Sequence, residues 1–451
     1  QFLTNFYKLF LLSKESFEKG EINKLLSKKD ERLAKAIDKS ILDDLLEIRR
    51  KLSNDLKHLR MHLTQEQIDE AVQILIDRLI FMRSVEDRGL EPMNFLLGIR
   101  KDYREGRLRK RLWDEFLILF KKFDKEYNSK LFASSILEDE TIFFGDDALQ
   151  KVIYTLYFGT NEDQIRYKFD EIPGDLLGSI YEQYLGTVLQ GTEKRVKLES
   201  ESGKRKKMGI YYTPYYIVDY IVKNTVGEYI KDKTIDEILE VKILDPACGS
   251  GSFLTRAFQE VANVIEERLK NGEKSKKYQS FQSHNGRLNL GQKATILLNC
   301  IYGVDLDEKA VELAQLNLLL KLLEDETPET KRRILPNMKD NIKNGNSLID
   351  DPKVAGDKAF KWEAQFPDVF RQGGFDVVVG NPPYVRPHKI SVKDKEFLWK
   401  NLKTFKAKSD LYSCFIEKGI NLTKVGGLFS FIVPHTWTSL ESFYEIRKYV
   451  I

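Results

Sequence analysis

Apolar residues recur along the first part of the chain at the spacing of an α-helix. Over Ile68–Ile80 they stand three or four positions apart, so one helix face would be apolar, and Gly89 is placed to end that helix. The stretches 109–123 and 174–189 carry the same periodicity, and runs of β-branched residues are few. The pattern predicts an all-α helical domain over residues 1–192.

The periodicity changes from about residue 240 onward, where short apolar runs alternate with helical segments. The predicted strands are 241–244, 300–305, 375–379 and 428–433, and the predicted helices are 251–269, 308–323 and 443–451. The polar stretch 270–291 predicts a surface loop. Strands that alternate with helices favour a parallel, doubly wound sheet. We therefore expect an α/β Rossmann-like domain over residues 193–451.

Residues 193–209 join the two predicted domains and are strongly basic, with almost no apolar residues. One interpretation is a solvated linker. The other is a loop that lies against nucleic-acid phosphates, where each Lys or Arg can release a counterion.

Composition narrows the class of protein. Among 451 residues, 73 basic and 69 acidic side chains leave a net charge of only +4, so any nucleic-acid surface must be a local patch. The three cysteines show no CxxC spacing, which argues against a disulfide framework or a metal site and favours a reducing cytoplasm. No apolar run approaches the roughly 20 residues of a membrane span, and there is no signal peptide. The chain starts at Gln1 inside an amphipathic pattern and stops at Ile451 inside a predicted helix, so we expect a piece of a longer protein whose α/β domain is incomplete at its C-terminus.

A glycine-rich turn follows the first predicted strand of the α/β domain. Its sequence is Asp-Pro-Ala-Cys-Gly-Ser-Gly over 245–251, and a helix follows at once. Glycines let a ligand approach the backbone, and a helix N-terminus offers free N–H donors to a phosphate or carboxylate. No Lys follows the second glycine, so the turn is not a phosphate-binding P-loop. Asp305 ends the next strand, where an acid binds ribose hydroxyls in Rossmann-like sheets, whereas Asp307 is expected to cap the following helix.

The third motif is Asn-Pro-Pro-Tyr over 381–384, directly after the strand 375–379. Two consecutive prolines fix the backbone and remove two N–H donors. The Asn381 oxygen and the Pro382 carbonyl would form a pair of acceptors suited to an amine with two hydrogens. Tyr384 adds a flat face on which a base could stack.

Together the motifs resemble those of N6-adenine DNA methyltransferases. The match rests on Gly-Ile-Tyr-Tyr-Thr-Pro over 209–214, the glycine-rich turn and Asn-Pro-Pro-Tyr, in an order that resembles the gamma arrangement. The resemblance implies S-adenosylmethionine as cofactor and transfer of its methyl group to N6 of an adenine flipped out of double-stranded DNA. It places Thr213 over the methionine end of the cofactor and Gly-Asn-Ser-Leu, 345–348, at its adenine, although Asn346 stands where the family often has Asp. The implied catalytic residues are Asn381, Pro382, Pro383 and Tyr384. The implied cofactor-binding residues are Tyr212, Thr213, Asp245, Ala247, Gly249, Gly251, Phe253, Asp305, Leu306, Asn346 and Ser347.

The helical half resembles the connector of type IIG restriction-modification enzymes through the segments 77–90 and 172–185. Those enzymes carry nuclease, connector, methyltransferase and target-recognition domains on one polypeptide. The resemblance implies that nuclease and target-recognition domains lie outside this chain.

Three alternatives stay open at this point. Asn-Pro-Pro-Tyr also occurs in methyltransferases that act on RNA bases or on protein glutamine. Asp236 with Glu240-Val241-Lys242 mimics the acidic triad of a nuclease. A DNA-binding module that no longer transfers methyl groups is the third.

Overall fold

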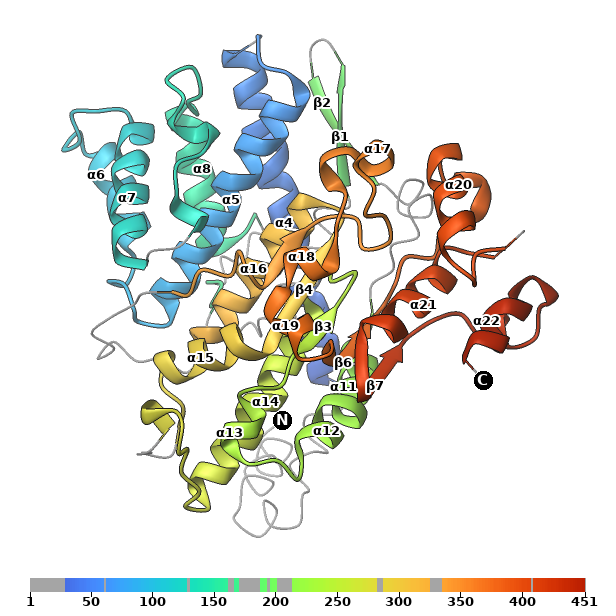
Figure 1. Ribbon diagram of the computed structural model, residues 1–451. Helices are drawn as coiled ribbons and strands as arrows, with labels where there is room; N and C mark the ends of the chain where they lie inside the picture. Colours follow the sequence, from blue (N-terminus) through green and yellow to red (C-terminus); the bar gives the residue numbers. More distant parts are fainter. Residues whose placement is uncertain are drawn as a thin grey trace, which may run out of the picture.

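The computed structural model describes residues 29–60, 62–127, 130–160, 166–169, 187–192, 195–200, 213–281, 287–324, 335–406 and 409–450. Helices from the first part of the chain pack beside a parallel sheet that is covered on both faces (Figure 1). The predicted class, an α/β Rossmann-like domain preceded by helices, is confirmed. None of the helices in these ranges is long and apolar enough to cross a membrane.

The described helices of the first part are α4 (Lys29–Leu59), α5 (Gln65–Asp87), α6 (Phe95–Arg104), α7 (Leu112–Tyr127) and α8 (Asp146–Phe158), with the 3₁₀ turns η1 (Lys130–Phe132) and η2 (Ile136–Glu138). Helix α5 begins with a capping box, in which the Thr64 side chain and Gln67 satisfy each other's backbone N–H groups. It ends where predicted, because Gly89 adopts a φ of 70° two residues after Asp87.

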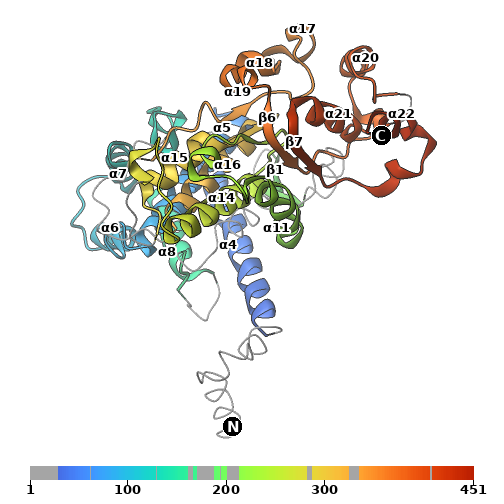
Figure 2. The ribbon, with the colours of Figure 1, turned by 60° about the horizontal axis from the view of Figure 1, so that its bottom comes forward.

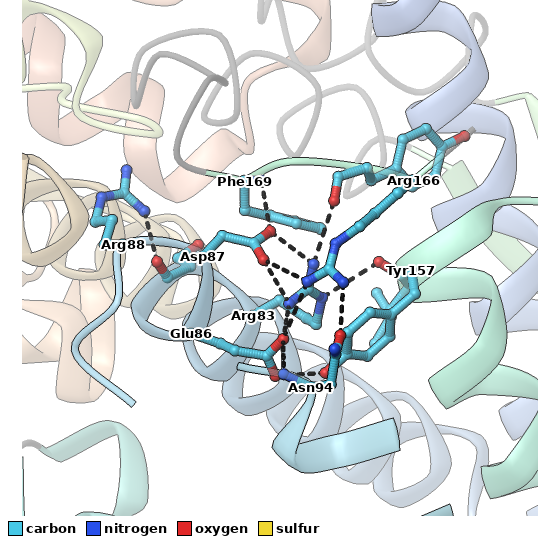
Figure 3. A network of polar contacts seen from close by, with 11 residues as sticks. Arg83, Glu86, Asp87, Arg88, Asn94, Tyr157, Arg166 and Phe169 are labelled. Atoms are coloured by element: carbon cyan, nitrogen blue, oxygen red, sulfur yellow. Dashed lines mark hydrogen bonds and ion pairs between the residues drawn. The ribbon is translucent and has the colours of Figure 1, made fainter. Parts of the chain in front are cut away.

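A buried network of charged groups fastens helix α5 to the segments around it (Figure 3). Arg83 donates to Glu86 at 2.7 Å and to Asp87 at 2.6 Å, and all three side chains are buried. Asp87 also accepts the backbone N–H of Phe169 at 2.9 Å and a guanidinium N–H of Arg166 at 3.1 Å. Burial of unpaired charge is costly, so these groups persist only as a complete network. The polar residues at the end of the segment 77–90 therefore have a structural role.

The sheet contains five parallel strands in the order β5-β4-β3-β6-β7. They are β3 (Ile243–Asp245), β4 (Ile301–Asp305), β5 (Ile342–Asn344), β6 (Phe375–Gly380) and β7 (Thr423–Phe431). Four of the five were predicted from the sequence. Strand β5 was not, because Ile342 is the one apolar residue among its three, whereas the equally short β3 overlaps Val241-Lys-Ile-Leu244, which has three apolar residues.

The helical elements of this half are α11 (Tyr215–Val222), the π-helical turn η3 (Lys223–Gly227), α12 (Glu228–Ile230), α13 (Ile235–Ile238), α14 (Ser252–Lys270), η4 (Gln279–Phe281), α15 (Leu290–Cys300), α16 (Glu308–Leu322), α17 (Pro352–Ala355), η5 (Gly356–Lys358), α18 (Trp362–Gln365), α19 (Pro367–Arg371), η6 (Pro387–Lys389), α20 (Val392–Asn401), α21 (Tyr412–Leu422), η7 (His435–Thr438), η8 (Glu441–Phe443) and α22 (Tyr444–Val450). The predicted loop over 270–291 begins after α14 and includes η4, whose Phe281 is buried.

Alternate residues of the strands enter two hydrophobic clusters, one on each face of the sheet. Ile243 and Val377 join the cluster on the side of α14 and α16, and Leu244 and Val378 join the cluster around Trp362. Figures 1 and 2 show helices α6–α8 and α20–α22 at opposite ends of the molecule. The first cluster runs without interruption from the sheet into helices α4–α8, so the two halves share one core.

One part of the sequence-based prediction is wrong. Residues at the end of the predicted helix 174–189 belong to strand β1 (Thr187–Thr192), which pairs antiparallel with β2 (Arg195–Ser200) inside the stretch expected to be a linker or loop. The reason is the strict alternation of apolar and charged residues over Val196-Lys-Leu-Glu199, a period of two that favours a strand. Residues 174–186 and 201–209 lie outside the described ranges.

Candidate active site

The candidate site lies at the carboxyl ends of the parallel strands. The chain proceeds from β3 to β4 and β5 on one side, whereas β6 and β7 lie on the other side of β3. The strand order therefore reverses between β3 and β6, which is where open α/β sheets bind ligands. Asp245 ends β3, and Gly380 ends β6 directly before Asn381.

The glycine-rich turn is built so that its backbone leaves β3 and enters α14 with positive φ at two residues. Gly249 has a φ of 50° and Gly251 a φ of 82°, a region that L side chains rarely adopt. A Cβ on Gly251 would also approach the Cβ of Ala314 to 3.0 Å. The N–H of Cys248 bonds to the carbonyl of Val304 at 3.0 Å, which ties the turn to β4. The buried Cys248 thiol fills space, and burial raises its pKa well above the usual range.

Asp305 fixes both the turn and the end of its own strand. Its carboxylate accepts the backbone N–H of Gly249 at 2.9 Å and that of Asp307 at 2.9 Å. Asp307 in turn accepts the N–H of Lys309 at 3.0 Å and caps α16, as predicted. Beside them the apolar side chain of Leu306 is 56 % exposed. A carboxylate and an exposed apolar side chain together are suited to a polar ligand that carries a flat ring.

Asp245 is the buried acid of the site, with 1 % of its surface exposed. Its carboxylate accepts the N–H of Ala247 at 3.0 Å. Its pKa is raised to about 8, chiefly because the group is buried; the hydrogen bond from Ala247 opposes this shift and the charge of Asp305 adds to it. Asp245 is thus largely protonated at neutral pH.

Gly380 was not predicted as a site residue, yet it brings the two motif-bearing turns into contact. A Cβ at this position would lie 2.5 Å from Oδ1 of Asp245 and 3.0 Å from its Cγ. Its place in the sequence, between a buried β strand and Asn381, could have identified it as a site residue.

We expect Gly380→Ala to destabilise the fold by about 1–3 kcal/mol, because both turns are packed and one must move. Gly98→Ala is the matched control. Gly98 lies in helix α6 with no atom within 4 Å of the added Cβ, so that change should be neutral or slightly stabilising. Urea unfolding of both variants tests the pair, and equal stability of the two would contradict the close contact.

The Asn-Pro-Pro-Tyr turn carries a chain of side-chain hydrogen bonds. Asn381 Nδ2 donates to Thr213 Oγ1 at 2.9 Å, so the residue preceding Pro214 lies beside the turn although it is 168 positions away. The Tyr384 hydroxyl lies 2.6 Å from Asn381 Oδ1 and 2.9 Å from the carbonyl of Ile432. A phenol has one hydrogen to donate, so it can serve either acceptor but not both at once.

The segment after β5 supports the glycine-rich turn from the other side. Ser347 Oγ donates to the carbonyl of Pro246 at 2.5 Å, and Trp362 Nε1 donates to the carbonyl of Ser347 at 3.0 Å. Asn346 Oδ1 accepts the N–H groups of Leu348 at 3.0 Å and Ile349 at 3.2 Å. The Asn346 oxygen is therefore already engaged in a local turn.

Two predicted cofactor residues differ from the rest in their placement. Phe253 is only 2 % exposed and belongs to the hydrophobic core, so its side chain supports the turn from beneath. Tyr212 lies outside the described residues. The structure brings Thr213, Asp245 and the Asn-Pro-Pro-Tyr turn together, and it joins Asp305 to the same glycine-rich turn.

The residues that mimic a nuclease triad are each engaged in a structural contact of their own. Asp236 accepts the N–H of Lys276 at 2.9 Å, Glu240 accepts the hydroxyl of Tyr278 at 2.6 Å, and Lys242 Nζ donates to the carbonyl of Asn299 at 2.7 Å. Asp236 and Glu240 hold the loop after α14, whereas Lys242 ties β3 to the end of α15. Within the described ranges, no cluster of His, Cys, Asp or Glu could hold a metal ion.

Comparison with known proteins places this geometry in a family. Residues 299–451 match the family model of the Eco57I restriction-modification methylase, and residues 239–331 match that of the RMKL-like methyltransferase domain. The type II restriction enzyme and methyltransferase RM.Eco57I of Escherichia coli is 33 % identical over 98 % of this chain and 43 % of its own length. The type II methyltransferase M.BstVI of Geobacillus stearothermophilus is 27 % identical over 54 % of this chain and 36 % of its own length. The adenine-specific methyltransferase PglX of Streptomyces coelicolor is 28 % identical over 42 % of this chain and 15 % of its own length.

The fold also matches a solved structure. The type IIL restriction-modification enzyme MmeI, solved in complex with DNA, superimposes with a TM-score of 0.51 at 17 % identity, covering 86 % of this chain and 50 % of that one. The chain spans less than half the length of the three curated relatives. Residues 299–451 therefore belong to a methylase domain of the Eco57I restriction-modification family, and RM.Eco57I aligns along 98 % of this chain.

Proposed function

We propose that this chain transfers a methyl group from S-adenosylmethionine to N6 of adenine in DNA, as the modification part of a restriction-modification system. The observation that carries the proposal is the contact between the glycine-rich turn and the Asn-Pro-Pro-Tyr turn at the point where the strand order reverses. A cofactor held by one turn and a base held by the other would meet there. The names of the relatives support the same assignment.

The residues present fit the cofactor. The turn before α14 offers backbone N–H groups at the N-terminus of a 19-residue helix, which suits a carboxylate. Asp305 would accept ribose hydroxyls, and the exposed Leu306 would pack on the adenine. Thr213, with Tyr212 before it, would cover the methionine end. The Asn346 side-chain oxygen is less suited to contact the adenine, since it already accepts two backbone N–H groups.

S-adenosylmethionine supplies a methyl group that its sulfonium sulfur already activates, so alignment is the main task of the protein. Asn381 Oδ1 and the Pro382 carbonyl would accept the two hydrogens of the target amine. These bonds draw the nitrogen towards tetrahedral geometry and free its lone pair for attack. The Tyr384 hydroxyl can turn from Asn381 to the Ile432 carbonyl, which leaves Asn381 Oδ1 available to the amine.

The target base lies inside the duplex, so it must be flipped out at a cost of a few kcal/mol. Stacking on Tyr384, worth about 1–3 kcal/mol, would offset part of this cost. The proposal also includes nuclease and target-recognition domains, which would lie on the same polypeptide outside this chain.

Calorimetry with S-adenosylmethionine tests the cofactor site. We expect the chain to bind it and Asp305→Ala to bind about 10- to 100-fold more weakly, because that variant loses the ribose acceptor and the anchor of Gly249. Asp307→Asn is the control, since Asn still caps α16 and only the neighbouring charge changes. A folded wild-type chain that does not bind the cofactor would count against the proposal.

The acceptor is then identified by offering duplex DNA, RNA and a glutamine-bearing protein with labelled cofactor. Recovery of N6-methyladenine from the DNA supports the proposal, and label on RNA or protein alone contradicts it.

A further inference from the structure

Residues 386–406, here called the basic lobe, leave the candidate catalytic turn and return to it. The N–H of Leu411 bonds to the carbonyl of Val385 at 2.9 Å, so the two ends of the excursion lie side by side. Figure 1 shows α20, the helix of the lobe, standing beside α21 and away from helices α4–α8. The lobe is thus attached at the carboxyl end of β6, next to Tyr384.

The basic lobe has an ordered attachment to the protein. Leu398, Leu402 and Phe405 are buried in a cluster with Phe415 of α21. The buried carboxylate of Glu417, also on α21, accepts the backbone N–H groups that follow Leu402, at 3.1 and 2.8 Å. The backbone of the lobe is therefore fixed, and the face opposite these buried residues is exposed to solvent in a fixed orientation.

Positive charge is concentrated in the lobe. It contains seven Lys or Arg against two acidic residues, a net charge of +5, whereas the whole chain has a net charge of only +4. The lobe is therefore a local basic patch of the kind that the sequence composition requires of a nucleic-acid-binding protein. The stretch 100–111 has the same net charge, but there Lys101, Arg107 and Arg111 form ion pairs with carboxylates.

Three exposed lysines of the lobe are not neutralised by carboxylates. They are Lys393 and Lys400 on α20 and Lys403 just after it, and none forms an ion pair in the part of the chain that the structure describes. Lys403 Nζ lies 5.9 Å from the centre of the Tyr449 ring. Glu396 lies between the first two on the helix, yet no ion pair forms. Elsewhere exposed lysines pair with a glutamate one helical turn away, as in Lys101 with Glu105, Lys231 with Glu228 and Lys270 with Glu266.

The same face carries two exposed apolar side chains. Val392 is 71 % exposed and Trp399 is 51 % exposed, and their spacing of seven residues places them on one side of α20. Lys393 and Lys400 repeat the same spacing beside them. Arg386 differs, because its guanidinium faces the half-buried Asp410, whose carboxylate offsets part of its charge.

We propose that the exposed face of the basic lobe binds the phosphate backbone of duplex DNA beside the target base. The inference rests on the proposed function and adds the surface that would hold the duplex. Lysine ammonium groups on a fixed backbone neutralise phosphates without reading sequence. Val392 and Trp399 supply an apolar edge against the sugars. The attachment next to Tyr384 brings the duplex to the turn that would receive the base.

The test replaces Lys393, Lys400 and Lys403 together by Gln in the full chain and measures binding to a duplex of mixed sequence by fluorescence anisotropy at several salt concentrations. Each phosphate contact contributes about 0.9 to the slope of log K against log salt. We expect the slope to fall by about 2–3 and the affinity at low salt to fall about 10- to 100-fold. Replacing the same residues by Arg keeps the charge and should keep the wild-type slope.

Lys121, Lys125 and Lys151 changed to Gln form the control, because these exposed lysines belong to α7 and α8, which Figure 1 shows away from α20, and the changes remove the same charge. A wild-type slope in the lobe variant, an equal loss in the control, or a wild-type chain that binds cofactor but not DNA overturns the inference. Calorimetry with S-adenosylmethionine on all variants keeps the two proposals apart. Absence of cofactor binding in the wild type counts against the proposed function, whereas intact cofactor binding with an unchanged salt slope counts against the lobe alone.

Discussion

Replacing Asn381 by Ala is expected to lower the rate of methyl transfer by on the order of 100- to 1000-fold and to leave S-adenosylmethionine binding unchanged. This is the size of effect seen when one preorganised polar group is removed from a reacting centre. The variant loses the oxygen that would accept the target amine and also the amide that bonds to Thr213. Single-turnover transfer of labelled methyl groups measures the rate, and calorimetry measures the cofactor.

Two further variants serve as a conservative replacement and as a control. Asn381→Asp keeps an acceptor oxygen and exchanges only the amide nitrogen, which faces a hydroxyl able to donate, so it should lose less activity than the Ala variant. Asn271→Ala removes an exposed Asn at the end of α14 and should behave as wild type. Turnover of Asn381→Ala close to that of Asn271→Ala would remove Asn381 from the chemistry.

Asp245→Asn is expected to change the dependence of stability on pH. Below pH 3.8 the carboxyl is protonated in both states, so it does not affect the free energy of unfolding. Between 3.8 and about 8 the unfolded chain ionises while the folded chain keeps its proton, so the stability of the wild type falls as pH rises. Asn does not titrate, so the free energy of unfolding of the variant rises relative to that of the wild type through this window. The difference reaches about 5 kcal/mol above pH 8.

Urea unfolding of both proteins from acid to alkaline pH measures this difference. Asn can still accept the N–H of Ala247, so the comparison isolates the ionisation. Asp357→Asn changes an exposed carboxyl and shows how much of the effect comes from the loss of one negative charge. A constant difference between wild type and Asp245→Asn at all pH values would mean that the buried acid does not titrate in this range.

The sequence predicted the parts of the fold that carry a clear periodicity. Helix α5 and the alternation from β3 to β7 follow from apolar spacing, and the Asp307 cap follows from its place before a helix. Strand β5 was not predicted because Ile342 is its one apolar residue, and the β1–β2 hairpin was not predicted because a charged stretch resembles a linker. The buried pairs of Arg83 with Glu86 and Asp87 were not predicted, since a sequence does not show which polar residues meet in the interior.

For the site, the motifs located the two turns and the structure supplied the contacts between them. The bond from Asn381 to Thr213 joins segments 168 positions apart, which no local pattern can predict. The approach of Gly380 to Asp245 and the second acceptor at Ile432 depend equally on how strands β3, β6 and β7 are ordered.

The hydrophobic cluster that continues from helices α4–α8 into the sheet bears on how such enzymes can be recombined. A cut between the halves would expose apolar side chains such as those of α5 and α16, and the separated pieces would tend to aggregate. A chimaera that joins the sheet of one relative to the helices of another would have to match both sides of this core. The natural module for exchange, in evolution or in engineering, is therefore the pair of halves inherited together.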